Sequence, residues 1–221
     1  MFSSKERKEK RIREGAGRVL DARTYNLIIG AVILYGFAVN AILIQFAGNF
    51  VMTINPIALI VGYFVSCLAG SLIVNFSKSP IISFLGYNLI VVPLGALLAI
   101  CLPEYDPQHI FMAMLLTGVV TLIMTALAAA KPNFFAKLGP TLFFSLLIGI
   151  IVEIIATLFG YHGDIFNWFF VIIFSLYIGF DWNRAQRYVK TADNAVDSAV
   201  DLYLDIINLF LRILSLISKK D

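Results

Sequence analysis

Long apolar segments follow one another along most of this chain, and short polar segments separate them. A helix that crosses a membrane needs about 20 predominantly apolar residues. Six segments approach or exceed that length, at residues 25–46, 56–74, 81–102, 109–130, 141–159 and 165–181. Pro, Asn and Gly residues, which favour turns, stand between them. The pattern therefore predicts an all-α integral membrane protein with at least six spans.

Residues 195–217 form a seventh predicted helix, which differs from the others because polar residues interrupt it at regular intervals. These residues recur every three or four positions: Asp197, Asp201, Asp205, Asn208 and Arg212. At this spacing they fall on one side of a helix. Lipid does not solvate such a stripe, so we expect the helix to face the interior of the bundle. For Asp197 and Asp201 an equal alternative is a position in cytoplasmic water, in the first turn of the helix.

The composition narrows the class of protein. Residues of the set AVILMFWYC make up 60% of the 221 residues, and charged residues only 14%, against about 25% in soluble domains. A soluble domain of this size could not bury so much apolar surface. The uninterrupted apolar segments argue against an outer-membrane β-barrel, whose strands alternate. Cys67 and Cys101 lie in apolar segments and are too few for a disulfide framework or a metal site.

The charges predict the orientation in the membrane. Residues 1–24 contain eight basic side chains: Lys5, Arg7, Lys8, Lys10, Arg11, Arg13, Arg18 and Arg23. If this segment is cytoplasmic, the basic residues of the later loops fall on the same side: Lys78, Lys131, Lys137, Arg184, Arg187 and Lys190. Because cytoplasmic loops are enriched in Lys and Arg, we expect a cytoplasmic N-terminal segment at 1–24, one transmembrane domain at 25–217 and a short tail at 218–221. The basic segment suits anionic lipid better than nucleic acid.

Two arrangements remain open for residues 195–217. The segment starts on the cytoplasmic side and ends at Lys219 and Lys220, so the charge pattern slightly favours a turn back to that side. Its length favours a full or nearly full crossing, which would give seven spans.

Ionisable residues inside apolar segments are the candidate functional residues, because each costs about 2.5–3.5 kcal/mol on membrane-insertion scales. Glu153 is the one charge in the core of its predicted span. It is a candidate pore-lining or cation-relay residue, and the alternative is a protonated side chain hydrogen-bonded to another helix. Asp201, Asn208 and Arg212 on the last helix share the candidate role in a cation path.

Asp181 and Asp205 form a candidate pair. Asp181 ends the sixth predicted span, and Asp205 lies in the next helix beyond a short connection. Both are therefore expected in the cytoplasmic half of the membrane, where a contact between them is plausible. Two carboxylates in a low dielectric do not both ionise cheaply, so they share a proton. Such a pair acts as a proton-controlled latch, or as a cation site when both groups ionise.

Two segments resemble the Bax-inhibitor family of membrane proteins. Residues 174–181, FSLYIGFD, are similar to the end of that family's sixth helix, and residues 199–210, AVDLYLDIINLF, are similar to its last-helix signature. The resemblance implies a bundle of seven transmembrane helices with the C-terminal helix near the centre. It also implies a pH-sensitive calcium leak, which in eukaryotic members accompanies suppression of cell death. The compact chain with short loops suits a bacterial member in the cytoplasmic membrane.

The resemblance assigns the family's paired aspartates to Asp181 and Asp205. Bacterial relatives also carry an Arg near the end of the second helix, which latches the first aspartate. The corresponding residues 75–80 read NFSKSP and contain no Arg. Lys78 is the candidate latch in its place, although an ammonium group cannot form the bidentate fork of a guanidinium.

These observations lead to one main functional interpretation and two alternatives. The main one is a non-enzymatic, pH-sensitive calcium-permeable leak channel or slow transporter gated by Asp181 and Asp205. Calcium would be the transported ion, with no cofactor, and lipid and other membrane proteins would be the partners. One alternative is a non-catalytic regulator that binds other membrane proteins. The other is an intramembrane aspartyl protease, although residues 179–181 lack the Gly-x-Gly-Asp pattern of those enzymes.

Overall fold

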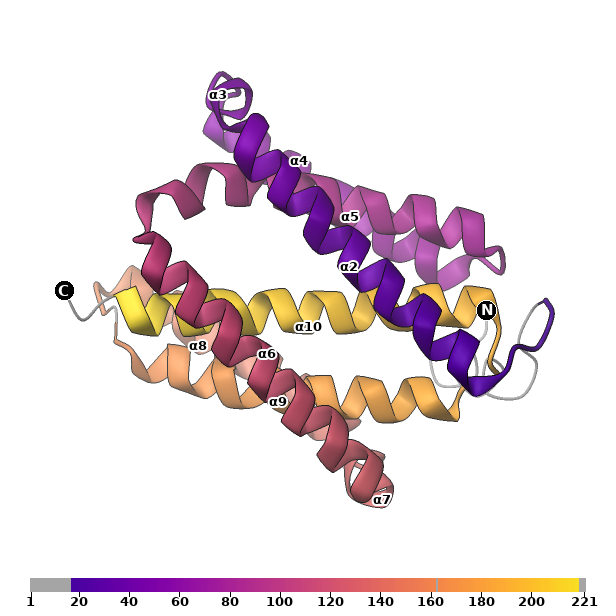
Figure 1. Cartoon of the computed structure of the whole chain (residues 1–221). Coiled ribbons are helices and arrows are strands. Elements are labelled where there is room, and N and C mark those ends of the chain that lie inside the picture. The colour runs from indigo at the N-terminus through magenta and orange to yellow at the C-terminus, as the bar shows by residue number, and fades with distance from the viewer. Residues whose placement is uncertain (1–16, 162, 219–221) are drawn as a thin grey trace. The chain divides into compact units, whose positions relative to one another are not determined.

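The computed structural model describes residues 17–161 and 163–218, and this part of the chain is helical without strands (Figure 1). Its long helices are α2 (Ala22–Phe46), α4 (Pro56–Phe76), α5 (Pro80–Cys101), α6 (Pro107–Ala130), α8 (Gly139–Leu158), α9 (Ile165–Arg187) and α10 (Ala192–Ser218). Three short elements lie in the connections: α3 (Gly48–Val51), the 3₁₀ turn η1 (Leu102–Glu104) and α7 (Pro132–Phe135). Most of the basic N-terminal segment and the C-terminal tail, including Lys219 and Lys220, lie outside the described residues.

Six of the described helices are long and apolar enough to cross a membrane, which confirms the six predicted spans. They are α2, α4, α5 with its extension to Glu104, α6, α8 and α9. The helix α10 has 27 residues but is not among them, because its acidic residues interrupt the apolar sequence. A seventh crossing is therefore not confirmed.

Two details of the predicted elements are wrong. The sixth helix does not end at Asp181 but continues to Arg187, since the polar residues after Asp181 can extend a helix beyond its apolar section. The last helix begins at Ala192, so Asp193 is the acid of its first turn. Asp197 and Asp201 lie deeper in the helix, and Asp197 is buried. The predicted alternative that placed both in a solvated first turn is therefore wrong.

Local side-chain chemistry determines where several helices begin. Pro occupies the first turn of α4, α5, α6, α7 and α8, where its missing N–H costs no hydrogen bond. The side chains of Asp21, Asn55 and Asp106 accept hydrogen bonds from backbone N–H groups at the starts of α2, α4 and α6. The hydroxyl and the backbone N–H of Thr24 both donate to Asp21 and lower the pKa of its carboxyl group. These caps satisfy donors that a helix start leaves free.

The chain packs as two compact units. The described residues of the first lie within Met1–Glu104 and Arg187–Asp201, and those of the second lie within Tyr105–Gln186 and Leu202–Asp221. The helix α10 contributes its first part to one unit and its second part to the other.

In the first unit, α4 and α5 approach each other closely at two glycines. A Cβ atom on Gly70 would lie 2.5 Å from the carbonyl oxygen of Gly86 and 2.9 Å from the Cγ1 atom of Ile90. A Cβ atom on Gly86 would lie 2.9 Å from the carbonyl oxygen of Gly70. Small residues at a crossing let membrane helices pack backbone against backbone, so these two glycines determine the distance between α4 and α5.

The same unit holds the start of α10 through hydrogen bonds to α2 and α5. The Tyr25 hydroxyl on α2 is 3.2 Å from the Ser198 hydroxyl, and the Ser83 hydroxyl on α5 donates to Asp193 over 2.8 Å. All four residues are buried. Because buried polar groups are costly without partners, these bonds fix which side of α10 faces α2 and α5.

In the second unit, phenylalanine rings pack against glycines of neighbouring helices. A Cβ atom on Gly139 of α8 would lie 2.8 Å from the Phe180 ring on α9. A Cβ atom on Gly179 of α9 would overlap the Phe135 ring of α7. Each ring therefore fits closely against the neighbouring helix, because the glycine that faces it has no side chain.

The glycine crossing gives a stability prediction. Gly70→Ala should lower the stability of the protein in lipid nanodiscs by about 1–3 kcal/mol, because its methyl group forces α4 and α5 apart. Gly62→Ala on the same helix is the matched control, since a Cβ atom there meets nothing within 4 Å. Thermal unfolding followed by circular dichroism measures both. Equal stability of the two variants would contradict the packing described above.

Candidate functional site

The polar stripe of the last helix lies inside the protein. Each residue of α10, from Ala192 to Ser218, is buried or half-buried. Helices α4, α6 and α8 differ, because few of their residues are buried and their exposed side chains are mainly apolar. The burial agrees with the predicted interior position of the stripe.

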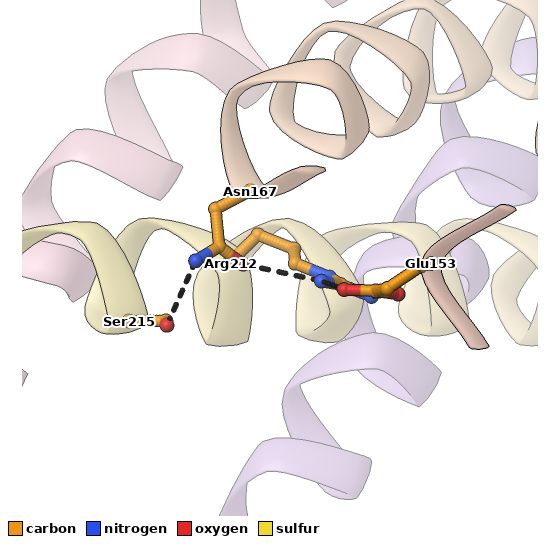
Figure 2. A network of polar contacts seen from close by, with 4 residues as sticks. All are labelled: Glu153, Asn167, Arg212 and Ser215. Carbon is orange, nitrogen blue, oxygen red and sulfur yellow. Dashed lines mark hydrogen bonds and ion pairs between the residues drawn. The ribbon is translucent and has the colours of Figure 1, made fainter. Parts of the chain in front are cut away.

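Glu153 and Arg212 form a two-bond ion pair between α8 and α10 (Figure 2). Nη1 of Arg212 donates to Oε1 of Glu153 over 2.5 Å, and Nη2 donates to Oε2 over 2.8 Å. The side chains are 26% and 27% exposed for Arg212 and Glu153. This paired geometry is the strongest form of guanidinium–carboxylate interaction.

Residues of α9 complete the surroundings of the guanidinium. Nη1 of Arg212 also donates to Oδ1 of Asn167 over 3.1 Å, and Nδ2 of Asn167 donates to the Ser215 hydroxyl over 3.0 Å (Figure 2). The centroid of the Phe170 ring lies 4.1 Å from Cζ of Arg212, at a distance typical of cation–π contacts. The guanidinium is therefore held by a carboxylate, an amide oxygen and an aromatic ring at once.

The sequence predicted part of this network. Glu153 and Arg212 were both candidates because each is a charge in an apolar helix, but their pairing was not predicted. Asn167 and Phe170 were missed. Asn167 is an uncharged amide in a largely apolar segment, a signal that could have identified it, whereas Phe170 is one of 19 phenylalanines and carried no distinguishing signal.

Asp181 and Asp205 are both buried, with 6% and 7% of their surface exposed. Oδ1 of Asp181 lies 2.9 Å from Nη2 of Arg184, one turn later on α9. Asp181, Asp205 and Arg184 all act electrostatically on the Tyr177 hydroxyl, so the four groups share one neighbourhood. The structure thus adds Arg184 and Tyr177 to the predicted pair. The spacing of three residues between Asp181 and Arg184 is typical of a helical ion pair and could have been recognised.

The remaining predicted residues occupy different surroundings. Nδ2 of Asn208 donates to the Leu204 carbonyl of its own helix over 2.7 Å, and Asp201 is half-buried on α10. Lys78 is exposed in the connection between α4 and α5 and belongs to a different unit from Asp181. The latch assigned to Lys78 stays a prediction.

Within residues 17–161 and 163–218, no group of three or more His, Cys, Asp or Glu side chains could hold a metal ion. Cys67 and Cys101 are both free thiols. Guanidinium groups lie beside Glu153 and Asp181 at hydrogen-bonding distance.

Comparison with known proteins identifies the family. The family model described as "Inhibitor of apoptosis-promoting Bax1" matches residues 18–221. The chain belongs to the Bax inhibitor family. This confirms the resemblance seen in residues 174–181 and 199–210 and extends it over most of the chain.

Relatives of this Bax inhibitor family protein occur in bacteria and plants. It is 30% identical to an uncharacterized protein of Helicobacter pylori over 163 residues, 70% of each chain. It is 30% identical to Protein LIFEGUARD 1 of Arabidopsis thaliana over 149 residues, 65% of this chain and 63% of that protein. It is 39% identical to Protein LIFEGUARD 4 of the same plant over 111 residues, 47% of this chain and 44% of that protein.

The ion pair between α8 and α10 gives a second stability prediction. Glu153→Gln should destabilise the protein by about 1–3 kcal/mol, because it leaves the Arg212 charge in the protein without its carboxylate. The double variant Glu153→Gln/Arg212→Gln should cost less than the sum of the two single changes, with a coupling of about 1–2 kcal/mol. Chemical or thermal unfolding in nanodiscs measures the cycle. Glu104→Gln is the control at an exposed glutamate, and strictly additive effects would show that the pair is not coupled.

Proposed function

We propose that this protein is a pH-sensitive calcium-permeable leak channel or slow transporter of a bacterial cytoplasmic membrane, with its N-terminus in the cytoplasm. Asp181 and Asp205 gate it. The observation that supports this most is the burial of two carboxylates, each more than nine-tenths covered, on consecutive helices of a Bax inhibitor family chain.

The formal charges of Asp181, Asp205 and Arg184 explain why binding of a proton and binding of a cation would be coupled. The formal charges of Asp181, Asp205 and Arg184 add up to −1 when both carboxylates are ionised, and to zero when the carboxylates share one proton. A net charge in a low-dielectric site is costly. The ionised site therefore favours uptake of either a proton or a cation. Acid and calcium would compete for the same two carboxylates.

The ligand chemistry of α10 suits calcium. Calcium ions bind oxygen atoms of carboxylates and amides, and the stripe of α10 presents Asp205 and Asn208 within one helical turn. The Asn208 amide nitrogen is bound to its own helix, which leaves the side-chain oxygen as the cation ligand.

The proton effect has a bounded size. A difference of one pKa unit between two states of a protein corresponds to about 1.4 kcal/mol, or a tenfold change in their ratio. The gate would therefore change the calcium flux by about tenfold over a moderate pH range and would not act as an absolute switch.

Calcium flux into liposomes tests the aspartate gate. For the purified protein, flux should vary with pH, and Asp181→Asn or Asp205→Asn should flatten that dependence because the shared proton is lost. The double variant should add little, since one interaction is removed in each case. Asp164→Asn, at an exposed position, should keep the wild-type curve.

Two outcomes would contradict this proposal. The first is a wild-type pH curve in both single variants, which would exclude the pair as the gate. The second is absence of calcium flux at every pH from a correctly folded protein. Cleavage of a transmembrane peptide that Asp205→Asn abolishes would instead indicate the intramembrane protease.

Arg184 gives an independent prediction for the same gate. Arg184→Gln removes the positive charge 2.9 Å from Asp181, so ionisation of the pair becomes costlier and the midpoint of the flux–pH curve should move about one pH unit higher. Arg184→Lys keeps the charge and should move the midpoint less. If Arg184→Gln leaves the midpoint unchanged, Arg184 does not influence the gate.

A further inference from the structure

Three oxygen atoms converge on one positive group at the Glu153–Arg212 pair. The two carboxylate oxygens of Glu153 and the amide oxygen of Asn167 all accept hydrogen bonds from the Arg212 guanidinium (Figure 2). The oxygens come from α8 and α9, whereas the guanidinium comes from α10. A set of carboxylate and amide oxygens is also the ligand set that hard divalent cations prefer.

We infer that Glu153 and Asn167 form a divalent-cation site that the Arg212 side chain fills as a tethered cation. When the guanidinium leaves, a calcium-like ion binds in its place. The site differs from the aspartate gate, because Arg212 follows Asp205 by seven residues, about 10 Å along the helix. It is an additional binding site, and it does not require the gate to exist.

The orientation of Asn167 favours this inference. Its amide nitrogen donates to the Ser215 hydroxyl, so its oxygen is directed to the guanidinium. Ser215 remains in place when Arg212 is substituted, and therefore the amide oxygen stays directed toward the position of the cation. The ligand set does not depend on the arginine alone.

The surroundings allow an ion to complete its coordination. Calcium takes six to eight oxygen ligands, more than the three oxygens supplied here, and water must provide the others. The Glu153 and Arg212 side chains are about one quarter exposed, so protein atoms do not fill all the space around the pair. The Phe170 ring covers the guanidinium from another direction and is buried, so further ligands would have to enter from the exposed side.

The charge balance predicts the effect of removing the arginine. With Arg212 present, the pair is neutral, and a divalent cation gains little. In Arg212→Gln the Glu153 carboxylate lacks its counter-charge inside the apolar span, where an isolated charge is strongly disfavoured. It then takes up a proton or binds another cation.

Thermal unfolding in nanodiscs of neutral phosphatidylcholine, with calcium chloride as the probe, tests the site. The wild type should show no calcium-dependent change in Tm from this site. Arg212→Gln should gain a rise of about 3–6 °C for each tenfold increase in calcium above its Kd, from the linkage of binding to stability. Arg212→Lys, which keeps a tethered cation, should behave as the wild type.

The double variant Glu153→Gln/Arg212→Gln decides whether the ion binds at Glu153. It should lose the calcium effect of Arg212→Gln, because the carboxylate is gone. If it keeps that effect, the ion binds elsewhere and the inference is wrong. A folded Arg212→Gln protein with no calcium effect also overturns it.

A second variant covers the case in which Arg212→Gln does not fold. Asn167→Asp retains the guanidinium but adds a carboxylate, so the site carries a net negative charge and should acquire calcium-dependent stabilisation. Asn167→Leu should not. If Asn167→Asp shows none, the site does not bind divalent cations.

The outcome is separable from that of the aspartate gate. The assay measures equilibrium binding and needs no flux, and Asp205→Asn should leave unchanged the additional calcium effect that Arg212→Gln gains over its Arg212 parent. A protein without pH-dependent flux could still show this binding. Loss of the calcium effect in Asp205→Asn/Arg212→Gln would place the ion at the aspartate pair and overturn the inference.

Discussion

A charged side chain inside a bilayer needs compensation from other protein groups, because hydrocarbon cannot solvate it. The last helix of this protein has more polar residues than a lipid-facing helix tolerates, and the contacts of both units reflect that. In the first unit, Tyr25 and Ser83 bond to the start of α10. In the second unit, Glu153 and Asn167 accept hydrogen bonds from Arg212, which lies near the end of α10. The apolar surface of α4, α6 and α8 is left for lipid.

The two charged clusters of the second unit satisfy this constraint in different ways. The Glu153–Arg212 pair matches one negative with one positive charge through two hydrogen bonds, so its formal charge is zero without any proton. The cluster of Asp181, Asp205 and Arg184 contains two carboxylates and one guanidinium. Its formal charge depends on protonation. For that reason we propose pH sensitivity for the aspartates and not for the pair, whose two charges compensate each other between α8 and α10.

The sequence predicted the helices well because the signal for a span is local. Apolar length and the Pro and Asn residues beside it located the starts of α4 and α5 to within a residue, and the stripe of α10 correctly indicated burial. The end of α9 was misplaced because the polar residues after Asp181 carry no stop signal. The seventh crossing depends on the membrane position of α10, which neither its length nor its charges determine.

Partner choice was harder to predict, because it depends on how the helices pack. Arg184 could have been found from its helical spacing to Asp181, whereas the pairing of Glu153 with Arg212 joins residues 59 positions apart. Any of the 15 glycines could have stood where two helices cross. Only the close approach of α4 and α5 in the structure distinguishes Gly70 and Gly86 from Gly62. The candidate site was therefore predictable as a set of residue types but not as a geometry.

The lengths of the helices have a consequence for the lipid around the protein. With 20 residues, α8 is about 30 Å long and just matches the hydrocarbon core of a typical bilayer. The two longest spans, α2 and Pro80–Glu104, have 25 residues each, about 37 Å, and they contact each other through the hydrogen bond from Tyr87 to Val32. Spans of that length must tilt by up to about 35° or extend beyond the hydrocarbon. In a thicker bilayer, α2 and Pro80–Glu104 would tilt less, whereas α8 would become shorter than the hydrocarbon core. A change in membrane thickness would therefore affect the helices of this protein unequally.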